Sequence, residues 1–225
     1  MPLDFEEFTL AAATADLGEE PAAREHADCV EFRMDLADGD PLEQLADYDG
    51  ELPLLVTNRP EWEGGEAADE GRIEALESAI EHDAVGAVDV ELATLAEGDG
   101  HDLVETATRR GVSVVVSTHD FEGTPPRAEL DRLLTRAGEV GDVAKLAVTA
   151  EDREDTLALL AATHAHASDG AKVATMAMGE AGSHTRAVAP VYGSKIGYAP
   201  VVPERATAPG QFDLATLRRL VDRLV

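Results

Sequence analysis

Short apolar runs rich in β-branched residues recur along the chain, and they constrain its fold more than any other feature. Between several of them apolar residues return at helical spacing, as at Ile73, Leu76 and Ile80. Strands that alternate with helices indicate βα units and a parallel sheet. Eight runs in 225 residues predict a (β/α)8 TIM barrel, and since no stretch resembles a linker, residues 1–225 are expected to form a single domain. The runs span residues 8–14, 29–34, 52–57, 85–92, 112–118, 143–149, 171–178 and 194–201.

The chain carries a formal net charge of −28, from 46 acidic and 18 basic residues, and this charge excludes several partners. Nucleic acids and anionic membrane surfaces would repel it. The acids are spread along the whole chain, which favours a solvated acidic surface over an acidic interaction module. With only three lysines, this composition predicts a halophilic protein, because high salt screens the self-repulsion.

Cysteine usage and the length of the apolar runs indicate the compartment. Cys29 is the only cysteine, so neither an internal disulfide nor a cysteine-based zinc site can form. The chain start lacks a basic segment followed by an apolar one, and no run approaches the roughly eighteen apolar residues of a membrane helix. We therefore expect a soluble, cytoplasmic protein. No glycine-rich dinucleotide motif or P-loop follows a strand, so no nucleotide cofactor is expected.

Several of the expected strands carry charge, although parallel strands covered on both faces are normally apolar. Glu31 and Arg33 share one face of their strand because successive side chains alternate, and so do Asp89 and Glu91. Lys145 stands in the middle of the run VAKLAVT. In a barrel the face away from the helices points into the lumen. These charges are therefore expected to converge at the C-terminal end of the strands, where barrel enzymes have their active sites.

Each of these residues also has a purely structural interpretation. Glu31 and Arg33 can form a buried ion pair, and Lys145 can extend its amine to a barrel rim. His119 can be a hydrogen-bonded loop residue, and Arg59 a surface arginine. All of them lie at or just after the ends of expected strands, however, and this shared position favours a common site.

A lysine buried near other cations suits one kind of chemistry. Burial and neighbouring positive charge favour a neutral amine, which can attack a ketone and form an iminium ion that acidifies neighbouring C–H bonds. A histidine can then move the proton, and arginines can hold a carboxylate. The residues therefore predict Schiff-base chemistry on a small anionic carbonyl compound. They leave aldolases, dehydratases and isomerases open.

Eight motifs connect the chain to one family, in the right order and at plausible spacing. They are EFRMD (31–35), TNRPEWEGGE (57–66), DVEL (89–92), STHDFEGTP (117–125), VAKLAV (143–148), MAMGEAGSHTR (176–186), YGSKIGYAP (192–200) and APGQ (208–211). Along nearly its whole length the chain resembles type I 3-dehydroquinate dehydratase, a shikimate-pathway enzyme of aromatic amino acid biosynthesis. The resemblance implies a (β/α)8 barrel, a homodimer, and a site that uses neither metal nor nucleotide but a covalent imine with 3-dehydroquinate.

The resemblance implies a catalytic group of three residues. Lys145 would form the Schiff base with the C3 ketone of 3-dehydroquinate. His119 would take the C2 proton and then protonate the departing C1 hydroxyl, which gives syn loss of water and 3-dehydroshikimate. Glu63 would orient and tune His119.

The resemblance also implies six substrate-binding residues, namely Glu31, Arg33, Arg59, Arg186, Thr207 and Gln211. The first two would contact ring hydroxyls and shape the surroundings of the lysine. Arg186 would grip the substrate carboxylate, with Arg59 adding positive charge. The last two would close over the substrate on a loop whose glycine and proline suit a mobile lid.

The chain departs from the family pattern at a few positions. Thr118 replaces the usual aromatic residue before the histidine, Thr185 and Thr207 each replace a serine, and Gly197 replaces a threonine. The run Ala11 to Ala13 stands where a substrate-contacting serine of the first strand would be expected, which argues against such a contact. Two alternatives stay open beside the dehydratase: another Schiff-base lyase or aldolase on the same barrel, and a non-catalytic binding protein that kept the fold.

Overall fold

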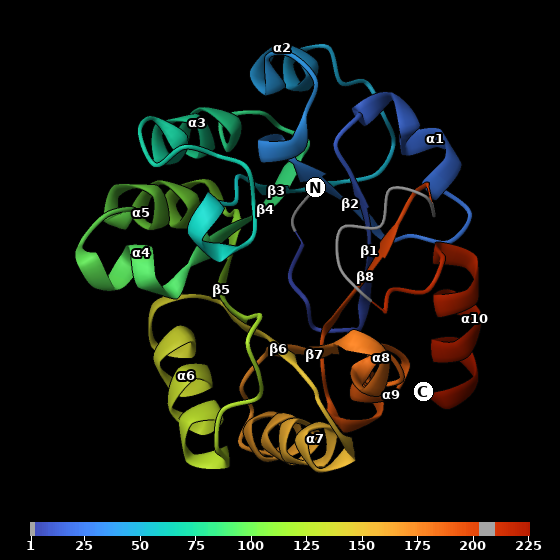
Figure 1. Cartoon of the computed structure of the whole chain (residues 1–225). Coiled ribbons are helices and arrows are strands. Elements are labelled where there is room, and N and C mark those ends of the chain that lie inside the picture. The colour runs from blue at the N-terminus through green and yellow to red at the C-terminus, as the bar shows by residue number, and fades with distance from the viewer. Residues whose placement is uncertain (1–2, 203–209) are drawn as a thin grey trace.

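The computed structural model describes residues 3–202 and 210–225, and these form a barrel of eight parallel strands inside a ring of helices (Figure 1). The strands follow one another around the barrel in the order β7-β6-β5-β4-β3-β2-β1-β8. A parallel bridge between Val173 and Ser194 joins the two ends of this order and closes the barrel. The strands are β1 (Thr9–Thr14), β2 (Cys29–Arg33), β3 (Leu54–Thr57), β4 (Val85–Glu91), β5 (Ser113–Asp120), β6 (Val143–Thr149), β7 (Val173–Met178) and β8 (Ile196–Pro200).

The predicted barrel is therefore confirmed, and all eight predicted runs contain a strand. One end differs in a way that matters for the site. The fifth run was expected to stop at Thr118, but β5 continues to Asp120 because its pairing with β6 continues there, with His119 opposite Ala147. His119 is thus a strand residue and not a loop residue.

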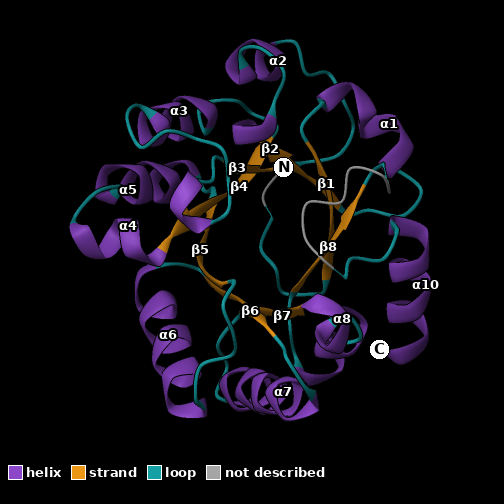
Figure 2. Cartoon of the chain, viewed as in Figure 1, coloured by secondary structure: helices purple, strands orange, loops and turns teal. Residues whose placement is uncertain are grey.

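Helices cover the outside of the barrel (Figure 2). The expected C-terminal helix is α10, and Asp213 caps it by accepting a hydrogen bond from the Thr216 N–H at 2.9 Å. No helix in the described ranges is long and apolar enough to cross a membrane. The α-helices are α1 (Glu20–Ala23), α2 (Pro41–Ala46), α3 (Arg72–Ala79), α4 (Leu92–Glu97), α5 (His101–Arg110), α6 (Arg127–Val140), α7 (Arg153–Ser168), α8 (Gly179–Gly182), α9 (Thr185–Val188) and α10 (Leu214–Leu224). Among the described residues, 3-10 helices lie at Leu17–Glu19 (η1), Met34–Leu36 (η2), Glu61–Glu63 (η3) and Ala189–Tyr192 (η4).

Alternation along the strands divides the buried side chains into an outer layer and a lumen. On β2, for example, Val30 and Phe32 pack in the layer beneath the helices, whereas Cys29 belongs to the lumen cluster. The other lumen residues are mostly small or β-branched, and they include Ala11, Leu55, Ala87, Val115, Val143, Ala147 and Ala174. Small side chains in the lumen leave room for the longer charged residues that share the inward face of the same strands.

The segment before β1 covers the N-terminal end of the barrel. Leu3 and Phe5 are buried in the lumen cluster. Lys172 and Lys195, which lie just before β7 and β8, donate hydrogen bonds from their amines to backbone carbonyls of this segment, at 2.7 and 2.5 Å. Two of the three lysines of the chain are therefore used at this end, and the third lies near the other.

Candidate active site

Lys145 projects from β6 into the lumen, with only 5% of its surface exposed. Its Nζ lies 2.8 Å from Oδ2 of Asp89 and 4.0 Å from Oε1 of Glu31. The same nitrogen lies 4.3 Å from the centre of the Tyr198 ring. The interpretation of Lys145 as a lysine that reaches a solvated rim is therefore wrong, and the amine lies among carboxylates and an aromatic face.

Asp89, on β4, ties Lys145 to a second cation. Its Oδ1 accepts hydrogen bonds from Arg59 Nη2 and from the Ser117 hydroxyl, both at 2.7 Å. Burial alone would raise the pKa of this carboxyl, but Arg59 and Lys145 outweigh it and hold the pKa of Asp89 well below its usual range. Asp89 is thus a fixed negative charge that forms ion pairs with two buried cations, Arg59 and Lys145.

Arg59 is buried and not a surface arginine. Besides Asp89, its guanidinium donates to Glu91 at 2.6 Å and to Ser117 at 2.7 Å. Glu91 in turn accepts a hydrogen bond from Arg72 at 2.7 Å, and Arg72 also donates to the Thr94 hydroxyl. A continuous chain of buried charges therefore runs from the lysine to helices α3 and α4.

His119 extends inward from β5, and Glu63 holds it. The His119 backbone N–H donates to Glu63 Oε1 at 2.7 Å, and the ring Nδ1 lies 3.6 Å from the same oxygen. The ring stacks with Phe121 at a centroid distance of 6.1 Å. Burial lowers the pKa of His119 well below 6.5, and the positive charges of Arg59 and Lys145 lower it further. The imidazole is therefore neutral at pH 7 and able to accept a proton.

Glu63 reaches this position through a tight turn of 3-10 helix, η3. Gly64 ends that helix at φ 80°, and a Cβ on Gly65 would lie 2.0 Å from the Arg59 carbonyl oxygen, so the glycine pair in EWEGGE is required sterically. Burial raises the pKa of Glu63 to about 7, although Arg59 opposes the shift from 3.8 Å away. Glu63 therefore changes charge near neutral pH.

Glu31 and Arg33 both lie on the lumen face of β2, as the alternation predicted, and both line the pocket. Glu31 accepts a hydrogen bond from the Thr57 hydroxyl at 3.1 Å. Arg33 binds Asp35 through two nitrogens, at 2.9 and 2.6 Å. The ion pair of Arg33 is thus with Asp35 and not with Glu31, and the Glu31 carboxylate points toward Lys145 instead.

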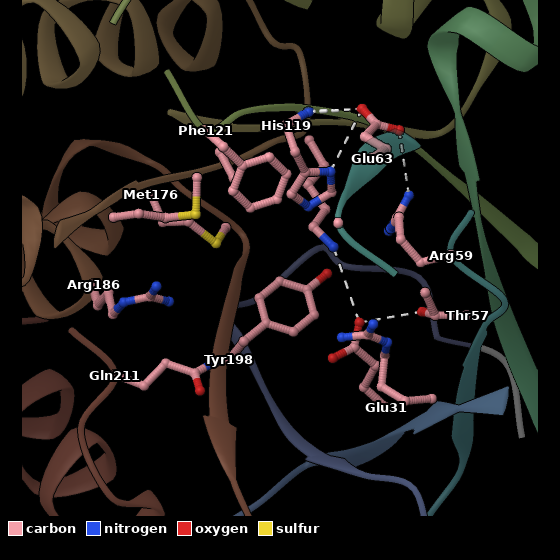
Figure 3. Close-up of a pocket in the computed structure, with 15 residues that line it drawn as sticks. Glu31, Thr57, Arg59, Glu63, His119, Phe121, Met176, Arg186, Tyr198 and Gln211 are labelled. Carbon is pink, nitrogen blue, oxygen red and sulfur yellow. Dashed lines mark hydrogen bonds and ion pairs between the residues drawn. The ribbon is translucent and has the colours of Figure 1, made fainter. Parts of the chain in front are cut away.

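Arg186 lies on the opposite side of the pocket from Arg59 and Glu63 (Figure 3). The Thr185 hydroxyl anchors its short helix α9 to the end of β7, because it accepts from the Ala177 N–H at 2.8 Å and donates to the Gly182 carbonyl at 2.7 Å. Thr185 therefore keeps the hydroxyl group of the serine that it replaces in the family pattern. Burial lowers the pKa of Arg186 to about 10.

These side chains surround one pocket at the C-terminal end of the strands. It brings together eight of the nine predicted site residues, from Glu31 to Gln211; the ninth, Thr207, lies outside the described residues. No β1 residue lines it in the part of the chain that the structure describes, in line with the alanine run. A buried amine, a neutral histidine held by a carboxylate, and a guanidinium on the far side suit an anionic carbonyl compound.

Several lining residues were missed by the sequence analysis, namely Thr57, Phe121, Met176, Met178 and Tyr198. The two methionines form an apolar wall beside Arg186, which Figure 3 shows for Met176. A stricter use of alternation on the seventh and eighth runs would have directed Met176, Met178 and Tyr198 inward. Phe121 follows its strand and carried no such signal.

A (β/α)8 barrel with a buried lysine in the pocket at the carboxyl ends of its strands is typical of enzymes that form Schiff bases. Comparison with known proteins gives the family. Residues 9–224 match the model of type I 3-dehydroquinase. The chain is 62% identical over 226 residues to a 3-dehydroquinate dehydratase of Haloarcula marismortui, covering 99% of this chain and 98% of that protein.

Two solved structures are similar throughout. The 3-dehydroquinate dehydratase of Geobacillus kaustophilus superposes with a TM-score of 0.86 at 30% identity, over 97% of this chain and 91% of that one. The type I enzyme of Clostridium difficile, solved with covalently modified comenic acid, gives 0.86 at 26% identity, over 97% and 92%. The chain therefore belongs to the type I 3-dehydroquinase family. It is a hydro-lyase of the shikimate pathway, which leads to the aromatic amino acids.

Proposed function

We propose that this chain dehydrates 3-dehydroquinate to 3-dehydroshikimate through an imine on Lys145, with His119 as the general acid and base. The observation that carries the proposal is the placement of Lys145 and His119 on adjacent strands, β6 and β5, in one buried pocket. Family membership supports the substrate, and it favours dehydration over the aldolase and the non-catalytic alternatives.

In the first step, the Lys145 amine attacks the C3 ketone, and the ketone oxygen leaves as water. The iminium that remains withdraws electrons from C2 and acidifies its proton. Asp89, at 2.8 Å from Nζ, stabilises the positive charge in the ammonium and in the iminium alike. Asp89 is therefore in place to pair with the iminium cation when it forms.

In the second step, His119 removes the C2 proton, and the electron pair moves into an enamine. The enamine then expels the C1 hydroxyl, which receives that proton from His119 and leaves as water on the same face. Water then hydrolyses the product imine, which restores the C3 ketone and frees the Lys145 amine. A neutral imidazole is required at the start, and its lowered pKa supplies it. Glu63 stabilises the imidazolium that forms between the two transfers. The 3.6 Å separation of Nδ1 from Oε1 has to shorten by about 0.7 Å for a hydrogen bond.

The substrate carboxylate is assigned to Arg186, whose guanidinium faces the pocket beside the methionine wall, with Gln211 on the same side (Figure 3). Glu31 and Arg33 are assigned to the ring hydroxyls at the other side. Arg59 is assigned the added positive charge that the resemblance implies. Since its guanidinium is held by Asp89, Glu91 and Ser117, we assign its charge to the surroundings of His119 and not to a direct contact with the carboxylate.

Reductive trapping tests the proposal. The protein is mixed with 3-dehydroquinate and borohydride in high salt, and the modified peptide is found by mass spectrometry. An adduct on Lys145 is expected. Lys172 and Lys195, which bond backbone carbonyls at the other end of the barrel, serve as internal controls and should stay unmodified. A folded protein that gives no adduct on Lys145 contradicts the mechanism.

A further inference from the structure

The hydroxyl of Tyr198 is a polar group in the pocket that the mechanism above does not use. Tyr198 lies on β8, is only 4% exposed, and lines the same pocket as Lys145 and Glu31. Its hydroxyl oxygen is buried and has no hydrogen-bond partner among the described residues. Figure 3 shows the ring reaching from β8 into the pocket, with the hydroxyl end directed away from Gln211.

A buried hydroxyl without a partner costs free energy, so proteins seldom retain one without a use. Packing does not require this group, since phenylalanine would fill the same volume. The hydroxyl also keeps its proton: burial raises the pKa of Tyr198 well above 10, and the charges of Glu31 and Asp89 raise it further. Tyr198 therefore offers a neutral O–H donor that no side chain of the described structure accepts.

The position of this donor relative to the amine indicates its acceptor. Lys145 Nζ lies 4.3 Å from the ring centre, so any carbon bonded to that nitrogen comes close to the phenol. The Glu31 carboxylate, 4.0 Å from Nζ, bonds the Thr57 hydroxyl. The side chains that contact Nζ most closely, Asp89 and Glu31, carry acceptor oxygens, so a ligand oxygen on the attacked carbon would find its donor beside the amine in Tyr198.

We propose that the Tyr198 hydroxyl donates a hydrogen bond to the oxygen on the carbon that Lys145 attacks, and so promotes formation of the imine. The inference rests on the proposed function and adds a catalytic residue to it. As the C–N bond forms, the carbonyl π pair moves onto this oxygen, where a fixed donor lowers its energy. Counted from the ammonium form, two of its three protons leave with the oxygen as water, and one stays on the iminium nitrogen. Tyr198 keeps its own proton throughout.

The test is Tyr198→Phe, which keeps the ring under the lysine and removes only the donor. Enzyme in excess is mixed rapidly with 3-dehydroquinate, quenched with borohydride at increasing times, and analysed for the Lys145 adduct. We expect imine formation to slow by about 10- to 100-fold. The thermal unfolding midpoint should stay the same or rise, because the lost hydroxyl has no partner among the described residues.

Tyr48→Phe is the matched control. The Tyr48 hydroxyl donates to the Leu52 carbonyl at 2.6 Å, and Tyr48 does not line the pocket. This variant should unfold at a lower temperature and form the imine at the unaltered rate. The two tyrosines are thus expected to show opposite patterns of stability and rate.

The outcomes separate this inference from the proposed function. If the unaltered protein gives no adduct on Lys145, the proposed function fails. If it gives the adduct and Tyr198→Phe forms it equally fast, the proposed function stands and the role of Tyr198 is refuted. A marked loss of stability in Tyr198→Phe would also refute it, since the hydroxyl would then serve the fold.

Discussion

Replacement of Glu63 by glutamine should make the protein more stable at neutral pH while it damages the site. Burial raises the pKa of Glu63 from the ordinary 4.5 to about 7. The folded state therefore retains this proton where the unfolded state has already lost it. Stability from this group is complete below pH 4.5 and is lost as the pH rises toward about 7. At about 1.4 kcal/mol per pH unit, the ionised carboxylate costs about 3 kcal/mol.

Glutamine keeps the acceptor for the His119 N–H but carries no charge, so Glu63→Gln should escape this loss. The measurement is urea unfolding at constant molar salt, with circular dichroism as the signal, for both proteins between about pH 5.5 and about pH 8. Over that range the free energy of unfolding of the variant should gain about 2 kcal/mol on the unaltered protein. Its turnover should fall about ten-fold or more, because the imidazolium loses its carboxylate.

Glu61→Gln is the control, since Glu61 lies in the same turn but is exposed. It should leave the pH dependence of unfolding unchanged. If the curves of Glu63→Gln and the unaltered protein run parallel, Glu63 does not titrate near neutral pH in the folded state. The assignment of its raised pKa to burial would then be refuted.

Three further outcomes are expected. Asp89→Asn should cost about 3–5 kcal/mol in urea unfolding, because two buried cations, Arg59 and Lys145, lose their shared carboxylate; a loss below about 1 kcal/mol would contradict the network. Arg186→Gln should raise KM about 100-fold with a smaller change in kcat, as expected for a group that binds the carboxylate, and an unchanged KM would remove that role. Dilution from molar to millimolar salt should lower the unfolding midpoint, because the net charge of −28 is then unscreened, and equal midpoints would refute the halophilic interpretation.

The alternation of side chains along the strands predicted which charged residues point into the barrel. It placed Glu31 and Arg33 on one face of β2, and Asp89 and Glu91 on one face of β4, and all four point inward. The inference works because a barrel strand has only two faces and the helices cover one of them. The direction of a side chain therefore follows from its position in a strand alone.

The partner of each charged side chain could not be predicted in the same way. The sequence suggested a Glu31–Arg33 ion pair as an alternative, whereas Arg33 binds Asp35 in the turn that follows its own strand. The β3–β4 register shifts between Leu54 and Leu55 and sets Thr57, two residues before Arg59, opposite Asp89. Such shifts depend on the packing of the whole barrel, and no local pattern records them.

The positions of the buried cations explain why Asp89 and Glu63 differ in pKa, although both carboxylates are buried. Asp89 accepts from both cations and from the Ser117 hydroxyl, so its charge is satisfied and fixed. Glu63 accepts one backbone N–H and has Arg59 only at 3.8 Å, so burial dominates its pKa. Two carboxylates with pKa values driven apart mark different duties. In the proposed mechanism, Asp89 holds the lysine in place, and Glu63 responds when His119 gains a proton. Arg59 lies 2.7 Å from Asp89 but 3.8 Å from Glu63, and Lys145 contacts Asp89 at 2.8 Å, so the two buried cations stabilise the charge of Asp89 more than that of Glu63.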